Sequence, residues 1–223
     1  MLVVDVIEEF IAGLDLSSAV LSSSTSLGQT TAVVENVFQA RSGLTCFIDG
    51  SEYVIASVDY DAKSVTLIEA VEAPVLFRMP SPFYFHGTPY ATNAHISRLS
   101  DSEKVPMIYL LEIIRETIQA EDAAAESVAE LRLFFLDVAN FEAWNTDDHY
   151  SKVIRPQRNL VDAFIKQARQ SKLFGVIEQL ELIVHVKFGV YHSEKGHLNS
   201  LFNDRLTGIE LKGSFPILGC CDC

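Results

Sequence analysis

Positive charge is missing from the start of this sequence, because residues 1–40 contain no Lys or Arg. The first 150 residues hold 7 Lys and Arg against 23 Asp and Glu, whereas residues 151–223 hold 10 against 7. The whole chain has a net charge of −13. A surface of this sign repels nucleic acid over most of its area. The opposite signs of the two parts favour head-to-tail association between copies, or else the acidity serves only solubility.

Long apolar runs and evenly spaced cysteines are also missing. No run reaches the roughly 18–20 apolar residues that a membrane span needs. Asp5, Glu8 and Glu9 stand where a secretory signal would carry positive charge. One cysteine is isolated and the other three fall in the last four residues: Cys46, Cys220, Cys221 and Cys223. We therefore predict a protein of a reducing compartment, with no export signal and no membrane segment.

The compact motifs of common enzymes are absent. The chain contains no G-x-S-x-G, no G-x-G-x-x-G and no H-E-x-x-H, and Lys195-Gly196 is not preceded by a phosphate-loop pattern. With 48% hydrophobic and 21% charged residues, the composition is that of an ordinary globular protein. We predict that the chain is not an enzyme, and we assign no catalytic, cofactor-binding or metal-binding residues.

The stretch "YFHGTPYATNAHIS" places His86 and His95 nine residues apart with Pro89 between them. Zinc would need further Cys, His or carboxylate ligands converging on the pair. Gly87 allows a sharp change of direction and Pro89 stiffens it, so the sequence favours a structural connection anchored by the neighbouring aromatic residues.

Two other groups of residues resemble metal ligands. The first combines histidines of the C-terminal third with the terminal cysteines: His185, His192, His197, Cys220, Cys221 and Cys223. Adjacent cysteines at a chain end do not have the spacing of a zinc site. The second is "NTDDHY", in which Asp147 and Asp148 precede His149, and a solvated loop is the favoured interpretation.

The first hundred residues divide into two parts. Residues 1–30 are expected to form an amphipathic N-terminal helix followed by a Ser-rich linker or arm, "SSAVLSSSTSLGQT". Residues 31–100 contain runs rich in Val, Ile, Thr and aromatics, which predict a small antiparallel sheet of three to five strands. "DYDAKS" suits a hairpin loop between two of these strands. Four prolines then predict a covering loop: Pro74, Pro80, Pro82 and Pro89.

Residues 101–223 are expected to form an α/β subdomain that ends in a Cys-rich tail. Pro106 at a first helical turn and an apolar stripe from Met107 to Ile118 predict a helix. "ELRLFFLDVA" predicts a buried strand, and "QLELIVHVKFGVYH" and "TGIELKGSFPI" alternate as strands do. The predicted fold class is α+β: a helix, a small antiparallel β subdomain, and an α/β layer with helices on a mostly antiparallel sheet.

A second helix is predicted over residues 155–172, with Leu160, Val161 and Phe164 on its apolar face. Its other side carries mostly positive charge: Arg155, Arg158, Lys166, Arg169 and Lys172. Contact with nucleic acid is one interpretation. Because no aromatic interleaving or recognition motif accompanies these residues, a solvated face or a docking surface for the acidic half of another copy is favoured.

The order of "FHGTPYATN", "KVPMIYLLEIIRE", "LRLFFLDVANFEAW", "IRPQRNLVDAFIKQARQS" and "DRLTGIELKGSFPI" resembles structural neck and tail-completion proteins of tailed bacteriophages, including tail-terminator-like subunits. The resemblance covers roughly residues 85–218. It implies a virion component, assembled in the host cytoplasm, that forms an oligomeric ring as a head–tail connector or tail terminator. The partners it implies are other copies, other neck or tail proteins, and the DNA channel through helix 155–172.

Two features of the chain agree with such a ring. The oppositely charged halves provide complementary surfaces, and "TGIELKGSFPI" is expected to be an exposed edge strand that a neighbour completes. The alternatives are a metal-dependent enzyme that uses His192, His197 and the terminal cysteines, and a cytoplasmic adaptor whose acidic surface binds a basic partner.

Overall fold

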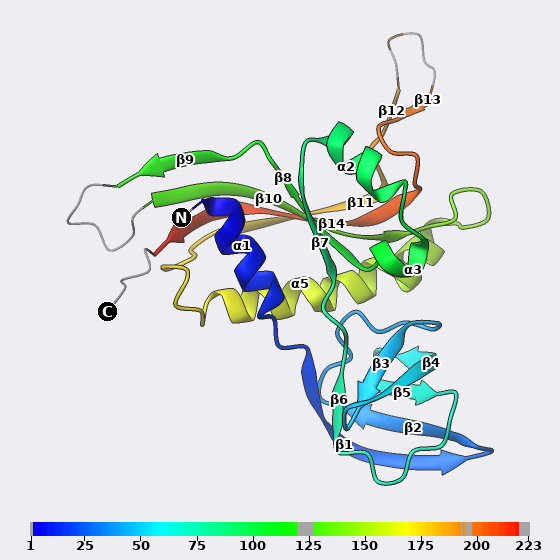
Figure 1. Ribbon diagram of the computed structural model, residues 1–223. Coiled ribbons are helices and arrows are strands. Elements are labelled where there is room, and N and C mark those ends of the chain that lie inside the picture. The colour runs from blue at the N-terminus through cyan, green and yellow to red at the C-terminus, as the bar shows by residue number, and fades with distance from the viewer. Residues whose placement is uncertain (1, 120–126, 193, 195–197, 219–223) are drawn as a thin grey trace.

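The computed structural model describes residues 2–119, 127–192, 194 and 198–218. These residues form the expected mixed α+β fold, with a small β-barrel below a larger sheet that has helices on both faces (Figure 1). No helix in the described part of the chain is both long and apolar enough to cross a membrane.

The barrel consists of six antiparallel strands in the closed order β1-β2-β5-β4-β3-β6. Its strands are β1 (Ser17–Ser26), β2 (Gln29–Val34), β3 (Thr45–Ile48), β4 (Ser51–Asp59), β5 (Ser64–Leu67) and β6 (Leu76–Arg78). Alternate side chains fill the interior, among them Cys46, Ile48, Ile55 and Phe77. The expectation of a small antiparallel sheet of three to five strands was therefore incomplete, because the sheet has six strands and closes into a barrel without free edges.

The Ser-rich segment is strand β1, so the prediction of a linker or arm was wrong. It pairs with β6 at its start and with β2 over the rest of its length. Residues 21–26 are all exposed, because this half of the strand extends beyond the barrel core. The apolar alternation that identifies a half-buried strand is absent for that reason.

The larger sheet has the order β11-β14-β10-β8-β7, and β9 pairs with the other half of β10. Its strands are β7 (Phe83–Gly87), β8 (Met107–Leu111), β9 (Arg115–Ile118), β10 (Ser127–Val138), β11 (Leu180–Phe188) and β14 (Leu206–Ile217). β10 and β14 pair along their whole length, from Ser127 opposite Ile217 to Val138 opposite Leu206. A separate hairpin consists of β12 (Val190–His192) and β13 (Leu198–Ser200).

The helices cover both faces of this sheet. They are α1 (Val3–Ala12), α2 (Pro89–Ile96), α3 (Asp101–Lys104), α4 (Thr146–His149) and α5 (Arg155–Ala168), with a π-helical turn, η1 (Tyr150–Ile154), leading into α5. α1 and α5 pack on one face, where Phe164 meets Phe10 and Phe135 edge-to-face at 5.0 and 5.5 Å between ring centroids. Ile96 of α2 belongs to the core on the opposite face. Helix α1 therefore packs with the sheet, and the barrel is an insertion between α1 and β7.

The structure confirms the amphipathic first helix, the β4–β5 hairpin, the buried strand β10, helix α5 and the strands β11 and β14. The Pro-rich covering loop in fact contains β6 and β7, although its prolines lie outside both strands.

Two expectations about the larger sheet were wrong. The helix predicted from Met107 to Ile118 is instead the two strands β8 and β9. In β8 all five side chains are buried and alternate between the two cores. A short apolar run that is buried on both faces fits the period of a helix as well as that of a strand. β14 is not an edge strand, since β11 and β10 lie on either side of it.

Phe164 joins α1 and α5 to the sheet, so Phe164→Ala is expected to lower the free energy of unfolding by about 3–5 kcal/mol, because it leaves a cavity among buried aromatic rings. Denaturant unfolding measures this change. The matched control is Lys166→Ala, an exposed position two residues along the same helix, which is expected to change stability by no more than about 0.5 kcal/mol. A loss below about 1 kcal/mol for Phe164→Ala would contradict this packing.

Candidate functional site

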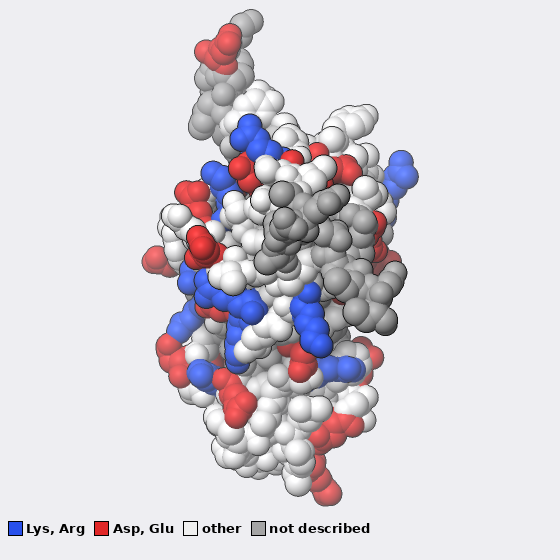
Figure 2. Space-filling view, turned by 90° about the vertical axis from the view of Figure 1, so that its left-hand side faces the viewer, with Lys and Arg blue, Asp and Glu red and all other residues white. Residues whose placement is uncertain are grey.

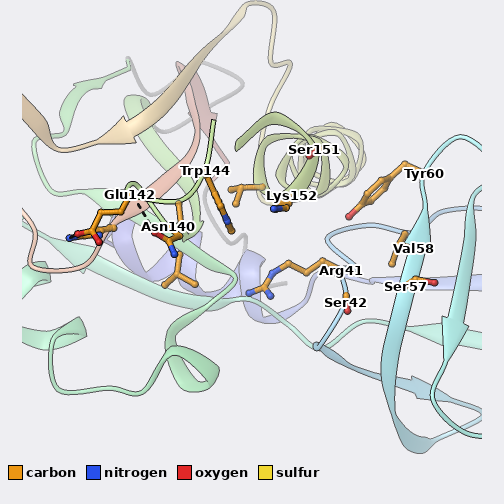
Figure 3. A pocket seen from close by; sticks show the side chains of 14 residues that line it. Arg41, Ser42, Ser57, Val58, Tyr60, Asn140, Glu142, Trp144, Ser151 and Lys152 are labelled. Atoms are coloured by element: carbon orange, nitrogen blue, oxygen red, sulfur yellow. Dashed lines mark hydrogen bonds and ion pairs between the residues drawn. The ribbon is translucent and has the colours of Figure 1, made fainter. Parts of the chain in front are cut away.

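A cavity of about 790 Å³ lies between the barrel and the larger sheet (Figure 3). On the barrel side, the lining residues come from the loop after β2 and from strand β4 and its end. On the sheet side, they come from the end of β10 and the segment after it, from η1, and from the residue before β14. The lining residues are Arg41, Ser42, Ser57, Val58, Tyr60, Val138, Ala139, Asn140, Glu142, Trp144, Ser151, Lys152, Val153 and Arg205.

Arg41 reaches from the barrel to Asp137 at the end of β10. Its Nε and Nη2 donate to the two carboxylate oxygens at 2.7 and 2.8 Å. The Asp137 side chain is only 2% exposed, whereas Arg41 is partly open to the cavity. A buried carboxylate needs such a partner, so this bidentate pair fixes the barrel against the sheet.

Tyr60 and Arg155 make a second connection between the barrel and the helical layer. The Tyr60 hydroxyl donates to the carbonyl oxygen of Ala40 at 2.7 Å, and burial raises the pKa of Tyr60 to about 12. The phenol therefore stays neutral at physiological pH. Arg155 at the start of α5 stacks its guanidinium over the Tyr60 ring and pairs with Asp61.

The opposite wall of the cavity is built around Trp144. Lys152 Nζ lies 4.9 Å from the centre of the indole ring and 2.7 Å from Asp148 Oδ1. The hydrogen bonds from Lys152 and from the backbone N–H of Asn145 hold the pKa of Asp148 below its ordinary value. Arg205 donates to Glu142 at 2.5 Å.

The cavity lining contains more cations than acids, and each of these cations forms an ion pair. Three cations line it, Arg41, Lys152 and Arg205, against one acid, Glu142. The carboxylates that pair with the first two, Asp137 and Asp148, are not among the lining residues.

A second charged group lies on the larger sheet. Glu210 of β14 is 2% exposed and accepts hydrogen bonds from Arg132 of β10 at 2.5 Å and from His185 of β11 at 2.9 Å. Burial raises the pKa of Glu210, but the hydrogen bonds and charges of Arg132 and His185 outweigh it, and the net pKa is lowered. Glu210 therefore stays ionised and holds three adjacent strands together.

His86 and His95 do not converge on one site. His95 stacks on Phe85 with 4.6 Å between ring centroids, whereas His86 follows Phe85 on β7 and so projects to the other side of the strand. The nearest acid to His86 is Glu112, 3.5 Å from Nδ1. In the structure, the aromatic residues anchor this stretch as strand β7 and helix α2.

The other metal candidates are also separated where they are described. His197 and Cys220, Cys221 and Cys223 lie outside the described residues, as does the side chain of His192. Within the described ranges, no group of three or more His, Cys, Asp or Glu side chains could hold a metal ion. Cys46 lies inside the barrel, where burial raises the pKa of its thiol to about 12 and keeps it unreactive.

"NTDDHY" forms the start of a helix rather than the expected loop. Asn145 and Asp148 cap the first turn of α4 by accepting each other's backbone N–H, which leaves Asp147 exposed. His149 turns inward and its Nδ1 lies 2.9 Å from the hydroxyl of Thr207.

His149 is held in its neutral form. The Thr207 hydroxyl donates its proton to the carbonyl oxygen of Val186, so it accepts from Nδ1–H of His149. Nε2 is buried and makes no hydrogen bond among the described residues. Burial and the charge of Lys187 lower the pKa of His149, against an opposing effect of Asp148.

The basic side of α5 is partly neutralised within the subunit. Arg155 pairs with Asp61, and Arg158 pairs with Asp162 at 3.0 Å. Beyond these pairs, Lys166 and Arg169 are exposed at the C-terminal end of the helix.

Sequence reasoning did not identify the cavity or the Glu210 group. Their residues are far apart in the chain: Arg41 and Asp137 are separated by 96 positions, and Arg132 and Glu210 by 78. The sequence contains one signal for the second group: the acid Glu210 lies within the mostly apolar first half of the strand predicted at "TGIELKGSFPI".

Comparison of the chain with protein-family models, with curated proteins and with solved structures finds no match in any of the three.

The neutral state of His149 predicts a pH-dependent stability. In the unfolded chain His149 titrates near pH 6.5, and in the folded protein its pKa is lower. As the pH falls below about 6.5, the unfolded chain takes up a proton that the folded protein does not, so stability that is fully present above that pH is lost. His149→Asn, which keeps a donor for Thr207, is expected to flatten the fall in unfolding free energy between about pH 6.5 and 5.

Denaturant unfolding at several pH values measures this slope. His95→Asn, which changes an exposed histidine, is the control and should retain the wild-type pH dependence. An unchanged slope in His149→Asn would show that another group causes the loss of stability.

Proposed function

We propose that this chain is a non-enzymatic assembly subunit that forms an oligomeric ring, and that the ring is part of the neck or tail end of a tailed-phage virion. The observation that carries the proposal is that, among the described residues, strands with one open edge lie on opposite sides of the larger sheet. The phage assignment itself rests on the order of sequence motifs, and the partners it implies are other neck or tail proteins.

The first of these sides is β11. It pairs with β14 along one side and ends the sheet on the other. Glu181, Val184 and Lys187 are exposed along it. A bulge between His185 and Phe188 interrupts its pairing with β14. Charged side chains and bulges prevent an edge strand from pairing with any exposed strand. A specific strand of another chain can still add to the edge by backbone hydrogen bonds.

The second side is β9, which pairs with the outer half of β10. Its four residues are all exposed. Ile118 at its end is 82% exposed, and Ile113 just before the strand is 71% exposed. In Figure 1 the pair β9–β10 extends beyond the body of the protein. Exposed apolar residues on a projecting strand are typical of a contact with another chain.

The positions of these two strands favour a ring. β9 and β11 lie on opposite sides of the β10–β14 pair, so a contact between β11 of one copy and β9 of the next uses two different surfaces. Such a heterologous contact repeats from copy to copy and closes into a ring when the rotation allows.

The charge distribution supports the same head-to-tail arrangement. Residues 17–79, which include the barrel, hold 7 Asp and Glu against 3 Lys and Arg. On the face in Figure 2, Lys and Arg gather across the middle of the molecule, whereas the lower end of the barrel shows only Asp and Glu among its charged residues. Opposite charges on different surfaces of one subunit favour an arrangement in which the acidic barrel of one copy meets the basic surface of the next.

The basic residues of helix 155–172 would also make the predicted contact with the DNA channel. Because Arg155 and Arg158 are engaged within the subunit, such a contact would depend on Lys166, Arg169 and Lys172. A docking surface for an acidic barrel accounts for the same residues without DNA.

Ile118→Lys and Val184→Lys each place a charge on one of the two edges, and each is expected to weaken self-association by about tenfold or more. Light scattering on the full-length protein, over a range of concentrations at low and high salt, measures the native mass. The wild-type protein should form discrete closed oligomers that dissociate as salt is raised.

Leu27→Lys is the matched control, because Leu27 is fully exposed on the β1–β2 turn of the barrel and lies on neither edge. It should assemble like the wild-type protein. A wild-type protein that stays monomeric at every concentration and binds no other virion protein would overturn the proposal, as would edge variants that assemble normally.

A further inference from the structure

We propose that the cavity between the barrel and the larger sheet binds a small amphipathic anion: an organic molecule with an apolar, preferably aromatic body and one carboxylate, sulfonate or phosphate group. This binding is independent of ring formation, because the cavity is built within one subunit and includes neither β9 nor β11.

The walls of the cavity suit an apolar body. Val58 and Tyr60 face it from the barrel, and Val138, Trp144 and Val153 face it from the sheet layer. Its volume of about 790 Å³ is in the range of pockets that enclose organic ligands, which are lined mainly by apolar side chains with a few polar groups that orient the ligand.

The polar groups of the cavity are mainly hydrogen-bond donors. Figure 3 shows Arg41, Asn140, Trp144 and Lys152 around the same hollow. Arg41 uses Nε and Nη2 for Asp137, which leaves Nη1 for another acceptor. The Asn140 oxygen accepts the backbone N–H groups of Glu142 and Ala143, so its NH₂ group is left for a ligand.

Two further donors complete the set. Trp144 contributes an indole N–H, which can only donate, and the Lys152 ammonium, paired with Asp148, lies 4.9 Å from the centre of the indole ring. The one lining carboxylate, Glu142, is already engaged by Arg205. A site with this excess of hydrogen-bond donors, some of them on cationic side chains, favours an anion.

The donors are also held in place before any ligand arrives. Asp137 fixes Arg41, Asp148 fixes Lys152, and the turn after Asn140 fixes its amide. Little conformational entropy is then lost on binding, which favours affinity.

The test compares two dyes with the same aromatic rings. 8-Anilino-1-naphthalenesulfonate carries an anion, and N-phenyl-1-naphthylamine lacks it. Trp144 is the only tryptophan of the chain and lies in the cavity wall, so its emission should fall as the dye binds. We expect saturable binding of one sulfonate dye per subunit, with weaker binding of the neutral dye.

Lys152→Met keeps an unbranched side chain one atom shorter but removes its charge, and is expected to weaken binding of the sulfonate dye by on the order of tenfold. Binding of the neutral dye should change little. Lys152→Arg, which restores the charge, should restore sulfonate binding. The control Lys166→Met, on the exposed side of α5, should leave both dyes unaffected.

Three results would overturn the inference. They are equal affinity for the two dyes, sulfonate binding that Lys152→Met does not weaken, and dye binding that disappears in Ile118→Lys, which would place the dye at the sheet edge instead. Because Lys152 is half exposed and its pair with Asp148 lies at the surface, its substitution is not expected to disturb folding.

Discussion

The ion pair between Arg41 and Asp137 is the interaction on which the relation between the two halves of this protein depends. The barrel is inserted between α1 and β7, and the Arg41–Asp137 pair connects its β2–β3 segment to the end of β10. Because Asp137 is buried, removal of the guanidinium would leave its charge without this bidentate partner, which is strongly destabilising. The same guanidinium lines the cavity, so the contact that positions the barrel also prepares the proposed anion site. Tyr60 and Arg155 support the arrangement from the helical side.

The twelve-residue pairing of β10 with β14 organises the rest of the molecule. One face of this pair carries α1 and α5 over a core rich in Phe, and the other carries α2 and the Glu210 group. Because the pair is central, β11 lies on one side of it, and β9, β8 and β7 lie on the other, so β11 and β9 each have an open edge among the described residues. We propose that these sides provide the contacts of a ring. In such a ring, attraction between the acidic barrel of one copy and the basic end of α5 in the next would favour the head-to-tail orientation.

Residues with a strong period were predictable from the sequence, and residues defined by distant contacts were not. The alternation of residues 180–188 and the apolar stripe of 155–168 led directly to β11 and α5. The prediction failed at residues 107–111, because burial on both faces removes the alternation of a strand. It failed in the Ser-rich strand because residues 21–26 are exposed on both faces, which also removes the alternation. The position of β14 inside the sheet and the cavity around Trp144 depend on strand order and on pairs such as Arg41–Asp137, which local patterns do not encode.

Electron cryo-microscopy of the purified full-length protein, at a concentration where it associates, tests the central claim most directly. The account predicts closed rings with a fixed number of subunits, in which β11 of each copy lies beside β9 of the next and the barrels face basic surfaces of their neighbours. Single subunits at every concentration, or oligomers whose contacts leave both β9 and β11 exposed to solvent, would contradict it.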